Sequence, residues 1–238
     1  MCMGATNKPI VLLQLRHVSE SLERERQAVL RTTQLPQDMI LPIDVLGGDS
    51  LLPALTGAAG LIIGGSGYSV FENYPRHDEL LECVVEAREI GLPMFGICFG
   101  IQLIAHAFGG RVIRDEPNRE RGTFVIHLTD AGCADPLFAG LPASFSAHCS
   151  HHDAVVELPE DARLLASSER CRVHAFVMPG RIYGVQFHPE RSRSEMERIF
   201  IRRENELANT NDQLSPGAAL SDATVASGVM RRFVEIIS

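Results

Sequence analysis

The chain has 238 residues, of which 45% are hydrophobic and 22% are charged, which excludes a disordered or low-complexity protein. This length indicates one domain, or one domain with an extension. The net charge of −8 argues against a dedicated nucleic-acid binder. No apolar run approaches the roughly 20 residues that span a bilayer, and residues 1–10 show no secretory signal. We therefore expect a cytoplasmic protein that binds neither membrane nor nucleic acid.

Buried strands alternate with helices in the first part of the chain. Short apolar runs predict strands at 9–15, 39–46, 60–63 and 93–97. Polar or periodic stretches predict helices at 19–31, 75–90 and 101–108. We expect Ser19 to cap the first helix. This alternation predicts an α/β fold: an open, mostly parallel sheet with helices on both faces.

The pattern changes to short strands after residue 110 and returns to helices near the end. The predicted strands are 123–128, 163–167, 173–177 and 181–187. Residues 178–181 predict a hairpin turn, which gives a β-hairpin region. Helices are predicted at 194–208 and 218–237, joined by the polar linker 209–217. We expect one domain at 1–191 and a C-terminal helical extension, 192–238, packed on that same domain.

Six cysteines are scattered along the chain without any CxxC pair, which excludes a ribbon-type zinc site. One of them, Cys98, lies in Gly96-Ile97-Cys98-Phe99-Gly100, between the fourth predicted strand and its helix. This is the nucleophile-elbow pattern, in which a tight turn projects the nucleophile from the sheet edge. The N-terminus of the following helix favours a thiolate, and the Phe99 amide is free to bind an oxyanion. Cys98 is thus a candidate nucleophile, and the motif by itself also fits a glycine-rich strand–helix turn with a buried cysteine.

A second motif, Gly184 to Glu190 (GVQFHPE), follows the last predicted strand. Pro189 disfavours helix at His188, so the segment is extended. Residues two apart on an extended segment face the same way, which places His188 and Glu190 on one side. A carboxylate that orients an imidazole is the third member of a catalytic triad. The motif by itself equally describes a core histidine next to a surface glutamate.

A metal site is the rival interpretation of the segment 148–153. His148, Cys149, His151, His152 and Asp153 are all residue types that ligate metals. They are close neighbours in sequence, however, and alternation along an extended chain sends neighbours to opposite faces. Three or four of them would converge on one ion only with a distant partner. We therefore expect no metal and no cofactor.

GICFGIQ at 96–102 and GVQFHPE at 184–190 together resemble the class I, triad-type glutamine amidotransferases. The similarity covers roughly residues 9–191 and is greatest to free-standing GMP-synthetase-like members. The resemblance implies a flavodoxin-like fold. It also implies that Cys98 is the nucleophile, His188 the general base and acid, and Glu190 its orienting residue. The Gly65 amide would join that of Phe99 in an oxyanion hole.

Further residues are matched by the resemblance. It implies that Gln102, Ser150 and His151 bind glutamine. Arg119 to Gly122 (RERG) is similar to a family RExG stretch near the active site. The loop at 64–71 reads GGSGYSVF where the family usually has GGP, which leads us to expect slow hydrolysis unless a partner completes the loop.

The resemblance implies hydrolysis of the side-chain amide of L-glutamine through a cysteine thioester, giving glutamate and ammonia for an unidentified acceptor. We find no room for a synthase domain in these residues, so the acceptor would be a separate synthase subunit. One alternative is a γ-glutamyl peptidase or hydrolase that uses the same triad on a γ-glutamyl small molecule. Another is a catalytically silent regulatory subunit, against which an intact Cys98, His188 and Glu190 argue.

Overall fold

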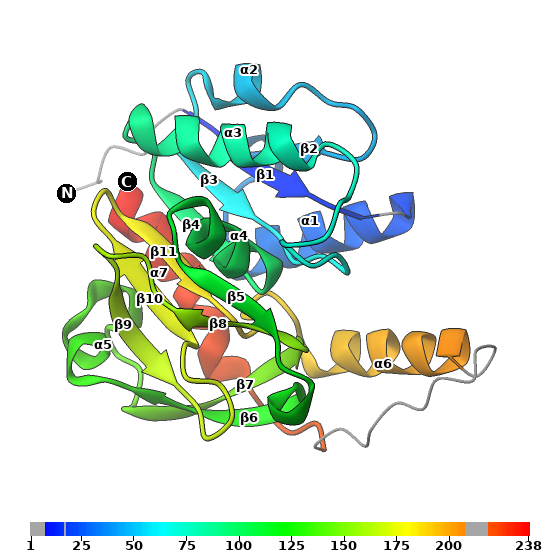
Figure 1. Ribbon diagram of the computed structural model, residues 1–238, viewed down its shortest axis with the longest axis vertical. Helices are drawn as coiled ribbons and strands as arrows, with labels where there is room; N and C mark the ends of the chain where they lie inside the picture. Colours follow the sequence, from blue (N-terminus) through cyan, green and yellow to red (C-terminus); the bar gives the residue numbers. More distant parts are fainter. Residues whose placement is uncertain (1–7, 17, 208–218) are drawn as a thin grey trace.

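The computed structural model describes residues 8–16, 18–207 and 219–238. Within them a nine-stranded sheet has the order β2-β1-β3-β4-β11-β10-β9-β6-β7, and β5 pairs with β8 in a smaller sheet (Figure 1). The strands are β1 Ile10–Gln14, β2 Ile40–Asp44, β3 Gly60–Ile63, β4 Met94–Ile97, β5 Arg111–Arg114, β6 Glu120–Leu128, β7 Ser144–His151, β8 Asp153–Glu157, β9 Arg163–Ser167, β10 Ala175–Met178 and β11 Ile182–Val185.

The sheet has a parallel half and an antiparallel half that meet at β11. The pairs β1–β2, β1–β3, β3–β4 and β4–β11 are parallel. The pairs β10–β11, β9–β10, β6–β9 and β6–β7 are antiparallel. The predicted open α/β sheet is confirmed, and its parallel strands are the near-continuous apolar runs typical of strands buried on both faces.

Helices cover both faces of the sheet and bury two apolar clusters (Figure 1). α2 (Leu51–Leu55), α3 (His77–Glu89) and α4 (Phe99–Ala107) supply one cluster. α1 (Ser19–Thr33) and α7 (Gly228–Ile237) supply the other. α5 (Asp130–Ala134) lies beside β9, and α6 (Arg193–Leu207) projects past the end of α1 (Figure 1).

The C-terminal helix is part of the main core. Phe233 of α7 is fully buried, and its ring lies 5.1 Å from that of Phe95 on β4. Both belong to the cluster that also holds Ile10 of β1. These contacts support the proposed packing of the segment 192–238 on the domain at 1–191, and that division stays a prediction.

Some local predictions differ from the structure. The helix expected from residue 218 begins only at Gly228, after a 3₁₀ turn at Thr224–Ser227. The first helix starts at Ser19 with Val18 as N-cap and no side-chain capping bond, so the predicted serine cap was wrong. The predicted linker 209–217 lies outside the described residues. No described helix is long and apolar enough to cross a bilayer.

Candidate active site

Cys98 occupies a strained turn between β4 and α4. Its φ of 54° and ψ of −99° lie where a residue with a side chain is rarely found. Two glycines make this turn possible, because a Cβ at Gly96 would lie 2.4 Å from Gly100 C, and one at Gly100 would lie 2.4 Å from Ile63 O. The backbone strain at Cys98 is of the kind that concentrates at functional sites.

We expect Gly100→Ala to destabilise the fold, because the rigid backbone of β3 has no room to yield to the added methyl group. Overpacking of this kind costs about 1–3 kcal/mol, and sometimes more. Urea unfolding measures the loss of free energy of unfolding. Gly67→Ala is the matched control: nothing lies within 4 Å of the added Cβ there, so its stability should stay close to that of the parent. Equal effects of the two substitutions would contradict this packing argument.

The predicted base and orienting residue lie next to Cys98 because their strand is the neighbour of β4. β11 pairs with β4 in parallel, with Val185 opposite Ile97, and the Cys98 amide donates to Val185 O at 2.9 Å. His188 follows β11 at the same edge of the sheet, and it lines the same cavity as Cys98, with His188 Cε1 and Cys98 Cβ lying 3.2 Å and 3.7 Å from the Cβ position of Gly65. His188 Nδ1 lies 2.9 Å from Glu190 Oε1. The structure thus brings the three predicted catalytic residues together.

The electrostatics of this pair favour a charged imidazole. Burial lowers the pKa of His188, but the Glu190 carboxylate and Cys98 outweigh burial and raise that pKa to about 9. For Glu190, burial raises the pKa, while His188 lowers it to about 2. Glu190 is 1% exposed. Arg191 Nε donates to Glu190 Oε1 at 3.1 Å, which adds a second cation beside this carboxylate.

The two residues predicted for the oxyanion hole border Cys98. Phe99 is the first residue of α4, where a backbone N–H has no intrahelical partner. Gly65 follows β3, and a Cβ there would lie 3.2 Å from His188 Cε1 and 3.7 Å from Cys98 Cβ. Both backbones are therefore close to the sulfur, and their oxyanion role stays a prediction.

The residues predicted to bind glutamine have different surroundings. The backbone carbonyl of Ser150 lies 3.9 Å from Cys98 Sγ. Gln102 is buried, and its Nε2 donates to Asp153 O at 2.9 Å and to Gln186 Oε1 at 3.1 Å. His151 points toward Glu120. Ser150 borders the cavity at Cys98, whereas Gln102 and His151 are engaged with the protein interior.

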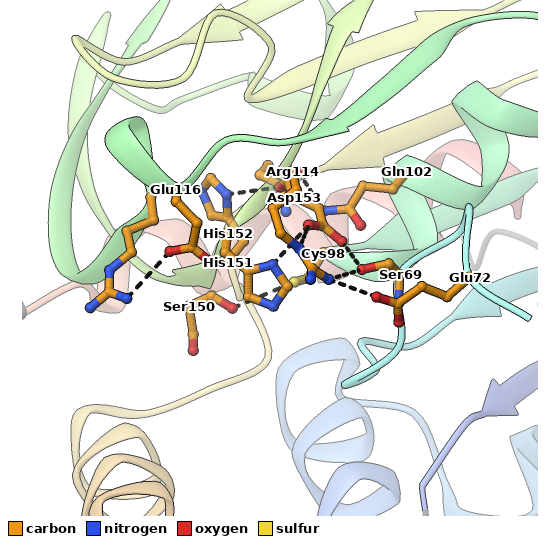
Figure 2. A network of polar contacts seen from close by, with 12 residues as sticks. Ser69, Glu72, Cys98, Gln102, Arg114, Glu116, Ser150, His151, His152 and Asp153 are labelled. Carbon is orange, nitrogen blue, oxygen red and sulfur yellow. Dashed lines mark hydrogen bonds and ion pairs between the residues drawn. The ribbon is translucent and has the colours of Figure 1, made fainter. Parts of the chain in front are cut away.

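Asp153 is the centre of a polar network that ties the loop after β3 to the segment 150–153 (Figure 2). Its carboxylate accepts hydrogen bonds from Ser69 Oγ and, at 3.3 Å, from Arg114 Nε. His152 Nδ1 lies 2.8 Å from the same carboxylate. Burial raises the pKa of Asp153, but the hydrogen bonds from His152, Ser69 and Arg114 lower it overall. Asp153 stood in the predicted segment, but its partners were missed, because they come from separate elements.

A buried carboxylate, Glu120, holds the other side of this segment. Its Oε2 lies 2.9 Å from His151 Nε2 and 2.7 Å from His174 Nε2, and Ser168 Oγ donates to Oε1 at 2.6 Å. Cys149 completes a group whose polar atoms lie within 4.8 Å of one another. A metal site in the segment 148–153 would need ligands from elsewhere in the chain. Glu120 and His174 lie in such positions, and the sequence alone did not reveal this. The contact of Glu120 with His151 holds the segment 148–153 against β6.

A cavity of about 580 Å³ opens on the candidate nucleophile, with Cys98, Ser150 and His188 in its wall. α1 and α6 line its other side. The sequence reasoning missed Arg16, which also lines it: Arg16 Nη2 lies 3.4 Å from the Cβ position of Gly65 and 2.5 Å from Glu25 Oε1. Its place just after a parallel strand was the available signal, since ligands bind at the carboxyl ends of such strands.

Comparisons with known proteins place the chain in a family. A family model described as "Glutamine amidotransferase class-I" matches residues 40–206. The chain belongs to the class-I glutamine amidotransferases. The predicted resemblance is therefore confirmed, and the protein is an enzyme of this family.

Solved amidotransferases share the whole fold. A glutamine amidotransferase from Thermotoga maritima aligns with a TM-score of 0.78 over 97% of this chain and 98% of its own, at 23% identity. One from Methylobacillus flagellatus aligns with a TM-score of 0.71 over 97% of this chain and 92% of its own, at 21% identity. At these identities the likeness supports the fold alone.

Curated relatives of this amidotransferase are larger proteins. The enzyme named "GMP synthase [glutamine-hydrolyzing]" from Aeropyrum pernix is 36% identical over 174 residues, which is 73% of this chain and 32% of that protein. The enzyme of the same name from Caldicellulosiruptor saccharolyticus is 41% identical over 145 residues, 60% of this chain and 26% of that protein. The chain thus matches about a third or less of their length, and is GMP-synthase-amidotransferase-like over that part.

We expect Cys98 to be the described cysteine that a glutamine-mimicking diazoketone labels. Burial raises the pKa of Cys83 and Cys171 to about 12, and that of Cys149 well above its usual range. Thiols are poor nucleophiles in that state. Exposed Cys133 serves as the internal control, since it should react with iodoacetamide and not with the glutamine mimic. Peptide mass spectrometry locates the adduct, and an adduct on Cys149 with Cys98 untouched would contradict the assignment.

Proposed function

We propose that this amidotransferase hydrolyses the side-chain amide of L-glutamine through a Cys98 thioester, releasing glutamate and ammonia. The observation that carries this proposal is that Cys98, His188 and Glu190 lie next to one another at one edge of the sheet. The Cys98 sulfur attacks the amide carbon, and the oxyanion forms near the amides of Gly65 and Phe99.

The imidazolium of His188 protonates the departing nitrogen, so the C–N bond breaks and ammonia leaves. The product on the enzyme is a γ-glutamyl thioester of Cys98. His188, now neutral, takes a proton from water, and the resulting hydroxide attacks the thioester carbon. Glutamate is released and the thiol is restored. Glu190 stays ionised throughout and orients the ring.

We propose that the ammonia acceptor is a separate synthase. This proposal is supported by the relatives, which are named as glutamine-hydrolysing GMP synthases. The loop after β3 is held at two points, by the Ser66 hydroxyl on Leu15 O at 3.3 Å and by Ser69 on Asp153. A partner that shifts this loop would move Gly65 relative to Cys98 and so complete the oxyanion hole. Without that partner, we expect the chain alone to turn glutamine over slowly.

A second candidate function is γ-glutamyl peptidase or hydrolase activity with the same residues. The cavity favours this candidate, because glutamine has ten heavy atoms and would fill at most about 300 Å³ at the ~30 Å³ that liquid water occupies per molecule. The cavity has a volume of about 580 Å³ and is open to solvent.

Glutamate release from glutamine and from γ-glutamyl dipeptides, with and without Cys98→Ala, tests these functions. Release from glutamine that depends on Cys98 supports the amidotransferase proposal. A faster reaction with the dipeptides supports the peptidase. No release from either substrate would leave the third possibility, a catalytically silent subunit.

A further inference from the structure

Arg16 holds a guanidinium group in the wall of the cavity at Cys98. It follows β1, at the carboxyl end of the parallel strands, and its side chain is 20% exposed, so part of the group faces the cavity. Arg16 Nη2 lies 3.4 Å from the Cβ position of Gly65, and that position lies 3.7 Å from Cys98 Cβ. The two distances add to 7.1 Å, so Nη2 lies no farther than that from the carbon that carries the candidate nucleophile.

Buried neighbours fix this guanidinium in place. Glu25, on α1, is 1% exposed, and its carboxylate accepts from Arg16 Nη2 at 2.5 Å and from Gln14 Nε2 at 3.1 Å. Gly64 leaves the space that this carboxylate fills, because a Cβ there would lie 2.6 Å from Glu25 Oε1. An ion pair that fixes one edge of a guanidinium pre-organises the other edge for a ligand.

Glu25 uses only part of the hydrogen-bonding capacity of Arg16. A guanidinium carries several N–H donors in a planar fork. To the residues that the structure describes, Arg16 makes one hydrogen bond, from Nη2 to Glu25, and its Nε is buried without a partner among them. Such unpaired buried polar atoms are rare in proteins. The donors of Arg16 that face the cavity are therefore available to a ligand with acceptor oxygens.

The proposed substrate carries such an acceptor at a matching distance. Four C–C bonds of about 1.5 Å join the side-chain carbonyl carbon of glutamine to its α-carboxylate carbon, so the extended chain spans about 5 Å. When the carbonyl carbon is bonded to Cys98 Sγ, the carboxylate can therefore reach a guanidinium that lies within 7.1 Å of Cys98 Cβ. Guanidinium and carboxylate groups form strong, often bidentate, hydrogen bonds.

We propose that Arg16 binds the α-carboxylate of the substrate, through the edge of the guanidinium that Glu25 leaves free. This inference rests on the proposed function and adds a binding residue to it. Every γ-glutamyl compound with a free α-carboxylate offers Arg16 the same group, so the residue serves the amidotransferase and the peptidase reaction alike. The contact forms on substrate binding and persists in the thioester, so its loss raises KM more than it lowers kcat.

The test compares L-glutamine with L-glutaminamide, in which an uncharged amide replaces the α-carboxylate. Hydrolysis of the side-chain amide gives glutamate from the first and isoglutamine from the second, and chromatography quantifies both. We expect kcat/KM of the parent chain to be roughly 10- to 100-fold higher for L-glutamine, the range expected for hydrogen bonds to a charged group. In Arg16→Gln/Glu25→Gln the ratio should fall about tenfold or more. The paired substitution avoids leaving the buried Glu25 carboxylate without its cation.

Arg111→Gln/Glu157→Gln is the matched control, since it removes an exposed ion pair between β5 and β8 that does not line the cavity. The control should keep the ratio of the parent, and thermal unfolding should show the parent fold in each variant. Arg16→Lys keeps a cation for Glu25 but loses the planar fork, so it should lower the ratio in the same direction by a smaller factor. A ratio that neither variant of Arg16 changes overturns the inference. Equal slowing of both substrates with unchanged KM also overturns it, because Arg16 then acts on the reacting atoms.

Binding measured without turnover keeps this inference separate from the proposed function. In Cys98→Ala, calorimetry should give a Kd for L-glutamine that rises about tenfold or more when Arg16→Gln/Glu25→Gln is added, and a Kd for L-glutaminamide that stays the same. Failure of the parent chain to hydrolyse glutamine, or hydrolysis that persists in Cys98→Ala, overturns the proposed function. The calorimetric comparison then still decides whether Arg16 binds the carboxylate.

Discussion

Replacing Cys98 with alanine should reduce glutamine hydrolysis to background. Among the other described cysteines, Cys83, Cys149 and Cys171 are buried with raised pKa values, which makes their thiols poor nucleophiles. Removal of a triad nucleophile costs on the order of 10⁶ in kcat in a well-studied serine protease, so a slow enzyme would lose all measurable turnover. Coupled detection of glutamate measures this loss.

Two controls make the result specific. Cys133→Ala changes an exposed cysteine on α5 and should leave kcat/KM as it is. Cys98→Ser keeps the polar atom and the elbow but replaces the sulfur with a poorer nucleophile, so it should also be inactive while binding glutamine. Since Cys98 is 5% exposed and packed in the core, thermal unfolding of each variant must show the parent fold. Residual hydrolysis in a folded Cys98→Ala would exclude the thioester mechanism.

The parallel half of the fold was predictable because its signals are local. β3 matches its predicted range of 60–63 without any shift, and β4 begins one residue after its prediction. Each is an apolar run bounded by glycine or proline. A strand that is buried on both faces has no alternation of polar and apolar residues, so the continuous apolar run itself predicts it.

β7 and β8 were not predicted. β7, residues 144–151, mixes serine, histidine and cysteine, and β8, residues 153–157, begins with an aspartate and ends with a glutamate, residue types that are uncommon in buried strands. They are buried because partners far along the chain satisfy their polar groups: Glu120 bonds His151, and Arg114 bonds Asp153. Such pairs depend on tertiary packing and leave no periodic trace in the sequence.

The contrast between local signals and contacts made by tertiary packing also explains which site residues could be predicted from the sequence. Cys98 and His188 stand in short motifs, and adjacent parallel strands bring those motifs to one edge. Arg16 has no motif, and its position depends on Glu25 one helix away.

Glu190→Gln should lower kcat and move the alkaline limit of activity to lower pH. Burial lowers the pKa of His188, but the Glu190 carboxylate and, after it, Cys98 raise that pKa from its ordinary 6.5 to about 9. In the parent enzyme the imidazolium that protonates the leaving nitrogen therefore persists until the pH rises through about 9. The glutamine side chain introduced at position 190 still forms hydrogen bonds but carries no charge, so the pKa of His188 falls. The loss of the orienting carboxylate of a triad costs roughly 10⁴ in kcat.

The same pKa shifts make the stability of the fold depend on pH. A pKa raised on folding gives stability that is complete below the unfolded value of 6.5 and is lost as the pH rises through about 9. The lowered pKa of Glu190 gives stability that is present above its ordinary 4.5 and is lost as the pH falls through about 2. Glu190→Gln removes both contributions, so its free energy of unfolding should vary less with pH at both ends than that of the parent.

The measurement is the pH profile of kcat/KM for glutamine between pH 5 and pH 10, with urea unfolding at the same pH values. Glu197→Gln is the matched control, because it removes an equal charge from α6, where Glu197 pairs with Arg193 and does not contact His188. The control should keep the alkaline limit near pH 9. Glu190→Gln should bring that limit down by one pH unit or more, since burial then acts on His188 without an opposing carboxylate. An alkaline limit that stays at pH 9 in Glu190→Gln would show that a group other than His188 protonates the leaving nitrogen.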